Sequence, residues 1–315
     1  MTNINLSATG GPPGHDEPKC PFCKEQTLLN YRTKYGEEKD EGKLRTNLAA
    51  SDQITDDKGS IFPFAGGNDK TKGWKADAGV FEDFEVEMAA APHHIIPGNT
   101  SMKRSKVETW TRASKGKIKQ DIGYDIDGAP NGVFLPHLPD IYFTREMDAK
   151  MWDDAAGDFV MTTTTKAKAY GQSWGDNKKK NQKGLSPGAK KSIVYTIMLE
   201  TSLQAHYSDH KSPYVHTNAA MNYDKECQDE LDQLDDLMKA KAQLCPQKDQ
   251  GDGKFNPPYS LVGLINGKSQ EVLTRITGRP KRWSSWISAA AHQLTFDIES
   301  GSIRDSFKGV IHRIT

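Results

Sequence analysis

The clearest hydrophobic pattern in the chain is a helical one in its last third. Leucine and methionine recur there at intervals mostly of three or four residues, among acids and amides, at Leu231, Leu234, Leu237 and Met238. This spacing places apolar side chains on one side of an α-helix. We therefore expect a helix over Tyr223–Leu244. A Gly- and Pro-rich segment, residues 249–258, ends it.

Weaker patterns predict the remaining elements. The segment Leu261–Ile314 predicts two further helices, with a core-facing side formed by Trp283, Trp286, Ile287 and Leu294. Apolar residues dominate Ile193–His206, which predicts a buried element. In Val80–Met88, apolar and acidic residues alternate, which suits a short strand or helix. Residues 24–75 are polar and turn-rich, so only short helical pieces are expected there.

These elements predict an α+β fold in three regions. Residues 1–84 form a polar, irregular N-terminal segment, residues 85–220 a mixed core, and residues 221–315 a largely helical C-terminal region. A Lys-, Asn- and Gly-rich stretch over residues 172–188 is expected to be a mobile loop within the core. The short run Thr162–Thr165 favours β-structure.

Composition excludes two classes of protein. With 315 residues, 35% of them hydrophobic, and 6 Trp, 11 Phe and 10 Tyr, the chain is polar but can build a core. No apolar run approaches the roughly 18 residues that a membrane-spanning helix needs, so we expect no membrane protein. The N-terminus has neither a charged start nor an apolar signal region, so synthesis in the cytoplasm without a Sec signal is expected.

The net charge of zero hides an uneven distribution. Residues 103–119 carry seven bases against Glu108 alone, and residues 166–191 carry eight lysines against Asp176 alone. Acids gather in residues 82–87 and 224–236. A basic run can attract a polyanion even in a neutral protein, although such runs are also ordinary solvated surfaces.

Two histidine pairs carry the candidate chemistry. His93 and His94 are adjacent, and adjacent residues on a strand point to opposite faces, so one can bind a metal while the other reaches a substrate. An imidazole accepts a proton from water near neutral pH. His206 and His210 are four residues apart, which on a helix would place both on one face, where they can grip a divalent cation.

The order of these residues resembles a nuclease family. His93-His94-Ile-Ile-Pro97, then Gly123-Tyr-Asp-Ile-Asp-Gly-Ala-Pro-Asn-Gly-Val-Phe-Leu-Pro136, then Gln204-Ala-His206 with His210 and Tyr214, is similar to the AHH group of the HNH/endonuclease VII (ββα-metal) nucleases. These occur as toxin domains in bacterial polymorphic and secretion-delivered systems. The resemblance covers residues 85–220 and implies a small ββα-metal core there.

The resemblance implies a role for each residue. His94 would be the general base, and His93 a metal ligand. His206 and His210 would complete the metal site from the helix of the ββα unit. Asn131 would come from the preceding loop and orient the base or touch the metal. The cation would be Mg²⁺, with Zn²⁺ or Mn²⁺ as alternatives, and would stabilise charge on the phosphate.

This chain departs from the family pattern at two points. Pro92 stands where the family has Ala, with Ala91 one position earlier. Between Asn131 and His206 lies a long gap that contains Lys166–Lys191, which we interpret as an insertion. If that interpretation is wrong, His137 would replace His206 as a ligand. Of the other histidines, His15, His292 and His312 are assigned to surface or core, and His216 to the surroundings of the site.

The resemblance also implies a substrate and partners. Lys103, Arg104 and Lys106 follow the histidine pair and would neutralise phosphates without sequence preference. Nonspecific DNA is the expected substrate, with RNA as the alternative. Such a toxin would need an acidic immunity protein in its producer. A contact-dependent machine, such as a type VI secretion system with its carrier, would deliver it into a target cell.

The cysteines give an independent signal. Cys20-Pro-Phe-Cys23 has the spacing of a zinc knuckle, and Cys227 and Cys245 would complete a four-thiolate structural zinc site only through the fold. Ordinary thiols are the alternative reading. With the basic middle, these cysteines also suit a second hypothesis, a noncatalytic zinc-binding nucleic-acid or protein adaptor. A third is a hydrolase acting on another phosphodiester.

Overall fold

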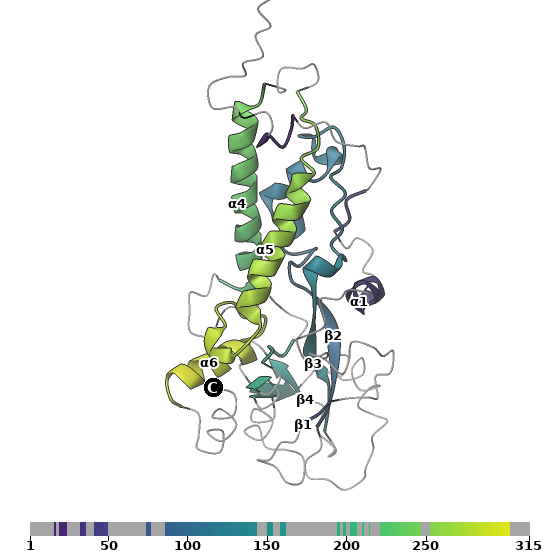
Figure 1. Ribbon diagram of the computed structural model, residues 1–315. Coiled ribbons are helices and arrows are strands. Elements are labelled where there is room, and N and C mark those ends of the chain that lie inside the picture. Colours follow the sequence, from purple (N-terminus) through teal and green to yellow (C-terminus); the bar gives the residue numbers. More distant parts are fainter. Residues whose placement is uncertain are drawn as a thin grey trace, which may run out of the picture. The chain divides into compact units, whose positions relative to one another are not determined.

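The computed structural model contains both helices and strands, which confirms the α+β class (Figure 1). It describes residues 16, 19–23, 32–35, 41–49, 74–76, 86–143, 150–153, 158–161, 194–195, 198–199, 202–206, 210, 214, 221–246 and 253–302. The predictions for residues 162–165 and 172–188 lie outside these residues. So does the lysine-rich insertion.

The chain divides into two compact units, each assembled from separate segments. Unit 1 comprises residues 1–38, 97–126 and 227–268, and unit 2 comprises residues 39–96, 127–226 and 269–315. This division differs from the three contiguous regions expected from the sequence. The division between the units falls within two helices. Unit 2 holds the first four residues of helix α4 (Tyr223–Leu244) and the last eight residues of helix α5 (Ser260–Ile276).

A three-stranded antiparallel sheet is the centre of unit 2. Its strands are β1 (Trp74–Ala76), β2 (Val86–His94) and β3 (Gly132–Phe143), in that order across the sheet (Figure 1). β2 pairs with β3 so that His93 lies opposite Val133 and His94 opposite Gly132, with a register shift between Met88 and Ala90. Strands β4 (Lys150–Asp153) and β5 (Asp158–Met161) form a second, two-stranded sheet. Of the segment Val80–Met88, for which a short strand or helix was expected, the described residues Val86–Met88 belong to strand β2.

A short helix packs against the start of β3. Helix α1 (Glu41–Ala49) places Leu44 and Leu48 in a buried cluster with Phe134. A Cβ atom on Gly132 would lie 2.7 Å from Cδ1 of Leu44 and 2.9 Å from Cδ2 of Leu48. Glycine is therefore the residue that lets α1 approach the strand this closely.

Three longer helices follow, as the sequence predicted. They are α4 (Tyr223–Leu244), α5 (Ser260–Ile276) and α6 (Ala289–Glu299). In α4, Leu231, Leu234 and Met238 are buried, but Leu237 is 40% exposed, so its assignment to the apolar face was wrong. At 100° per residue, Leu237 lies about 120° from Leu231 around the helix, whereas Met238 returns to within about 20° of it.

The C-terminal part of unit 2 contains most of the predicted apolar core residues. Trp283, Ile287 and Leu294 are buried, and Trp286 is half-buried with its indole N–H donating to Thr295. Ser288 caps α6 by accepting a hydrogen bond from the N–H of Ala291. The described parts of Ile193–His206 also contain buried side chains, at Val194, Tyr195, Met198, Leu199, Leu203 and Ala205.

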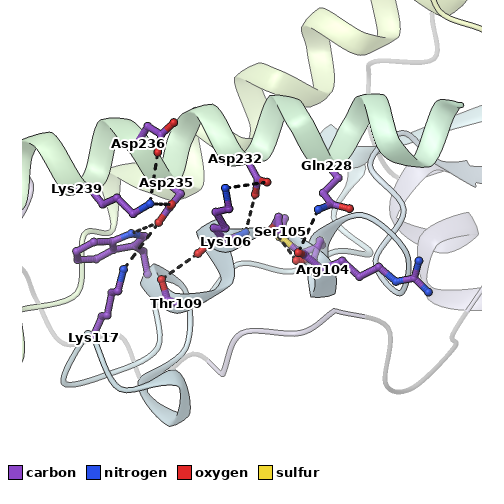
Figure 2. A network of polar contacts seen from close by, with 12 residues as sticks. Arg104, Ser105, Lys106, Thr109, Lys117, Gln228, Asp232, Asp235, Asp236 and Lys239 are labelled. Atoms are coloured by element: carbon purple, nitrogen blue, oxygen red, sulfur yellow. Dashed lines mark hydrogen bonds and ion pairs between the residues drawn. The ribbon is translucent and has the colours of Figure 1, made fainter. Parts of the chain in front are cut away.

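Unit 1 pairs the acidic helix with the basic run. Its short 3-10 helices are η3 (Met102–Arg104), η4 (Lys106–Trp110) and η5 (Ala113–Lys115). The buried carboxylate of Asp235 on α4 accepts a hydrogen bond from the indole of Trp110 at 2.9 Å. Figure 2 shows Lys239 and Lys117 beside Asp235. Asp232 likewise accepts from the backbone N–H of Lys106 at 2.7 Å. Part of the negative charge of the acidic run on α4 and part of the positive charge of the basic run, residues 103–119, therefore balance each other within unit 1.

No helix in the described part of the chain is both long enough and apolar enough to cross a bilayer.

Candidate metal centre

The end of strand β2 separates the adjacent histidines into two environments. His93 is 1% exposed and its ring lies among other imidazoles, whereas the His94 side chain is 27% exposed and bonds to Asp127. Alternation along the strand is the physical reason, because successive side chains leave opposite faces. The two side chains therefore have different surroundings, and the different roles expected for them stay predictions.

A backbone hydrogen bond to strand β3 holds His206 beside His93. The backbone N–H of His206 donates to the carbonyl of Pro136 in β3 at 2.6 Å, so the backbone of His206 is attached to the sheet. Gln204 fixes the same segment, since its side chain donates to the carbonyl of Ser285 at 2.7 Å and accepts from the N–H of Ile287 at 2.9 Å. Gln204 is fully buried. These bonds explain how a residue so far from β2 in sequence comes to lie beside His93.

His210 completes the cluster beside the start of α4. Its Nδ1 lies 3.6 Å from a carboxylate oxygen of Asp224, and its ring contacts Tyr223. Tyr223 also donates from its hydroxyl to the carbonyl of Ile95, just after the histidine pair. The first turn of α4 therefore contacts both His210 and the backbone that follows the pair His93-His94.

The expected helical placement of His206 and His210 was wrong. His206 lies in extended backbone and His210 in a turn, so a shared helix face does not bring them together. The reason is the bond to Pro136, which holds His206 in a sheet-like conformation. The two rings meet nevertheless, with their Nε2 atoms 3.0 Å apart.

The donor geometry of His93, His206 and His210 fits one metal ion. One ring nitrogen from each lies within 4.8 Å of the others. Nitrogens bound at about 2.0–2.1 Å to a tetrahedral ion lie about 3.3 Å apart, close to the 3.0 Å between His206 and His210. The same 3.0 Å also suits a hydrogen bond in which the Nε2–H of one of these two rings donates to Nε2 of the other. However, neither ring nitrogen of His93 has a hydrogen-bond partner among the described residues, and a ligated ion would satisfy one of them.

Burial keeps His93 in the form that binds metals. Burial first, and then the neighbouring imidazoles His206, His210 and His94, hold the pKa of His93 well below its ordinary value. A neutral imidazole has a lone pair available for a cation. Imidazole donors suit zinc and similar transition metals better than Mg²⁺, which prefers oxygen ligands.

On the other face of β2, His94 is held by a carboxylate. Nε2 of His94 lies 2.9 Å from Oδ1 of Asp127, which is 3% exposed. Helix α1 supports Asp127 in turn, because Asn47 donates to its backbone carbonyl at 2.7 Å and Nζ of Lys43 lies 4.0 Å from Oδ2. Such a partner fixes which ring nitrogen carries the hydrogen. With Nε2 donating to Asp127, Nδ1 has the free lone pair.

Asn131 fixes the backbone after the histidine pair. Its Oδ1 accepts hydrogen bonds from the N–H of Ile96 at 2.8 Å and from the hydroxyl of Ser269 at 3.0 Å. Its Nδ2 donates to the carbonyl of Ile96 at 3.1 Å, and its own carbonyl accepts from the N–H of Ile95. These contacts hold the backbone that follows β2. The two roles expected for Asn131, to orient the base or to touch the metal, stay predictions.

The basic residues predicted to bind phosphate belong to the other compact unit. Lys103, Arg104 and Lys106 are in unit 1, whereas the histidines of the cluster are in unit 2. Arg104 and Lys106 are exposed, and Lys103 is half-buried. His292 is buried against Tyr214 and Trp286, as expected for a core residue. His15, His216, His312 and the side chain of His137 lie outside the described residues.

The four cysteines do not form one site. The sulfur atoms of Cys20, Cys23 and Cys245 lie within 4.8 Å of one another, so a possible three-thiolate metal group is present in unit 1. Cys227 was wrongly included. It lies near the start of α4, and at 1.5 Å per residue the helix carries it about 27 Å from Cys245.

Sequence reasoning missed the residues that support the site. Asp127 follows a strand-like segment in a turn-rich stretch, and nothing in its spacing distinguishes it from other turn aspartates. Gln204, Tyr223 and Asp224 are equally ordinary in sequence. The quoted segments Gly123–Pro136 and Gln204–His206 contain Asp127 and Gln204, but only the fold shows what each side chain contacts.

Comparison of the chain with models of protein families, with curated proteins and with solved structures gives no match.

Proposed function

We propose that this protein is a metal-dependent endonuclease that hydrolyses phosphodiester bonds, with nonspecific DNA as its substrate. The observation that carries the proposal is the convergence of His93, His206 and His210, which are remote in sequence, next to a fourth histidine held by a carboxylate. The buried imidazole of His93, whose ring nitrogens have no hydrogen-bond partner among the described residues, is costly unless a ligand binds it. Its position in this cluster therefore favours a functional cation.

The three imidazoles would hold a divalent cation. When bound, it would stabilise the negative charge that develops on the scissile phosphate and on the leaving oxygen. The donor set favours Zn²⁺ over the Mg²⁺ expected from the sequence, because all three donors are nitrogens. Asp224 beside Nδ1 of His210 would orient that ring as a ligand.

His94 would act as the general base. With its Nε2 hydrogen directed at Asp127, its Nδ1 lone pair accepts a proton from the attacking water. Asp127 then stabilises the imidazolium that forms, as a buried carboxylate does in other histidine-dependent hydrolases. Asn131 and Tyr223 would hold the backbone that carries both histidines.

Binding of DNA would be electrostatic. Arg104 and Lys106 have exposed side chains on the basic run of unit 1, with half-buried Lys103 beside them, and phosphate contacts of this kind carry no sequence information. RNA would be bound by the same contacts. Parallel assays on plasmid DNA and on RNA identify the substrate.

The experiment is cleavage of supercoiled plasmid by the full chain with Zn²⁺, Mn²⁺ or Mg²⁺. We expect cleavage by the wild type, loss of cleavage on chelation, and no cleavage by His94→Ala at unchanged metal content. His292→Gln, a histidine outside the site, is the control. An inert wild type with every metal, or His94→Ala as active as the wild type, would contradict the proposal and favour the noncatalytic adaptor.

The biological role we propose is an antibacterial toxin. Expression of the wild type in a bacterial cytoplasm should then stop growth and degrade the chromosome, whereas His94→Ala should be tolerated. A producer would need an immunity protein that binds the toxin. Growth unaffected by an active wild-type enzyme would separate nuclease activity from the toxin role.

A further inference from the structure

A second cluster of metal-binding side chains lies in unit 1. The sulfur atoms of Cys20, Cys23 and Cys245 all lie within 4.8 Å of one another, and Sγ of Cys23 lies 3.5 Å from Sγ of Cys245. Sulfurs bound at about 2.3 Å to a tetrahedral zinc ion lie about 3.8 Å apart. The observed spacing is near that value and far from the roughly 2.05 Å of a disulfide bond.

The turn that carries the first two thiols is fixed by contacts of its own. The N–H of Cys23 donates to the carbonyl of Cys20 at 3.4 Å, which closes the turn. Phe22 between them is fully buried, with its ring 4.7 Å from that of Phe255 and 5.5 Å from that of Trp110. Asn256 donates to the carbonyl of Phe22 at 3.2 Å. Both thiols are therefore positioned without help from a metal.

The third thiol comes from the end of a long helix. Cys245 directly follows α4, is 4% exposed, and donates its N–H to the carbonyl of Ala242. The carbonyl end of a helix carries partial negative charge, which favours a cation nearby. Two parts of the chain that are distant in sequence thus meet here: the turn at Cys20–Cys23, and the end of α4 with the loop around Phe255 that follows it.

We propose that Cys20, Cys23 and Cys245 bind a structural zinc ion that joins the Cys20–Cys23 turn to the end of α4. Thiolates are soft ligands that select zinc, and a C-x₂-C turn is a usual half of such a site. Cys227 takes no part. This site is independent of the histidine centre and of the proposed nuclease activity.

Cobalt substitution tests the ligand set. Full-length protein is stripped of metal under reducing conditions and titrated with Co²⁺, which gives a strong near-ultraviolet charge-transfer band only when thiolates ligate it. We expect a band saturating at one equivalent in the wild type and in Cys227→Ser, and its loss in Cys23→Ser and Cys245→Ser. Absence of the band in the wild type, or its loss in Cys227→Ser, would overturn the proposal.

Two further measurements distinguish metal binding by the thiolates from metal binding by the histidine centre and from misfolding of a variant. In His206→Ala/His210→Ala the cobalt–thiolate band should persist, which separates this site from the catalytic one. Zinc added back to metal-free His206→Ala/His210→Ala protein should raise the Tm and slow alkylation of Cys23 at least tenfold. A Cys23–Cys245 disulfide in protein purified without reductant, with no zinc in protein purified under reducing conditions, would instead identify the cluster as a redox pair and overturn the proposal.

Discussion

The Nε2 atom of His94 lies 2.9 Å from Oδ1 of Asp127, a carboxylate 33 residues later in the chain and only 3% exposed. A buried carboxylate is costly unless it is bonded, and here Nε2 of His94 and Nζ of Lys43 lie close to its two oxygens, while Asn47 donates to the backbone carbonyl of Asp127. The pair therefore constrains the ring of His94 much as second-shell carboxylates constrain metal-bound histidines. Through this pair, helix α1, which contacts Asp127 through Asn47 and Lys43, supports the proposed general base His94.

Replacement of Asp127 by Asn should reduce cleavage while leaving metal binding intact. The amide can still meet the ring, but it no longer stabilises the imidazolium, so we expect a loss of about 10- to 100-fold in kcat/KM. Plasmid cleavage and zinc analysis measure the two effects. Asp236→Asn, on an exposed carboxylate of α4, is the matched control and should have wild-type activity.

Removal of either later histidine should strongly weaken metal binding. Changes to residues that only hydrogen-bond to a metal ligand already cost about 10- to 100-fold in affinity, so loss of a ligand itself in His206→Ala or His210→Ala should cost at least about 100-fold. Isothermal titration with Zn²⁺, in protein with the thiols blocked, gives the affinity. Unchanged binding in both variants would show that the imidazoles of His93, His206 and His210 share no ion.

Asn131→Ala should destabilise unit 2 rather than remove a catalytic group. The substitution leaves the N–H and carbonyl of Ile96 and the hydroxyl of Ser269 without their shared partner, which should cost about 3 kcal/mol in the free energy of unfolding. Urea denaturation measures it. Ser269→Ala, which removes only one of these three hydrogen bonds, should lose less, and equal losses would argue against this account.

Gly132→Ala should also destabilise, because the added methyl group would lie 2.7 Å from Cδ1 of Leu44 and 2.9 Å from Cδ2 of Leu48, so both buried leucine side chains would have to shift. We expect a loss of about 1–3 kcal/mol and, through displacement of α1 from Asp127, reduced cleavage. The matched control is Gly263→Ala in α5, where nothing lies within 4 Å of the new Cβ. Because alanine is the better helix former, this control should gain about 0.5–1 kcal/mol.

The Asp235 network should dominate the stability of unit 1. Asp235→Ala removes the acceptor of the buried Trp110 indole and the partner of Lys239, which should cost about 2–3 kcal/mol. Asp236→Ala, at a side chain 76% exposed on the same helix, should change stability by no more than about 0.5 kcal/mol. Thermal unfolding followed by tryptophan fluorescence compares them. Equal effects would contradict the role given to Asp235.

The sequence by itself determined the helices and the chemical types of the site residues. The bounds of α4 could be predicted because its apolar residues repeat with the helical period and polar residues flank them. The histidine pair could be identified because adjacent imidazoles at a strand end must diverge. Both inferences depend only on local backbone geometry, which the neighbouring residues encode.

Only the tertiary structure decided which residues meet. Pairing with Pro136 placed His206 beside His93 in extended backbone rather than on a helix, and the length of α4 separated Cys227 from Cys245. The carboxylate at Asp127 gained its importance from α1 and from the sheet register. Such contacts arise from packing between segments remote in the chain, and no local spacing or periodicity in the sequence carries that information.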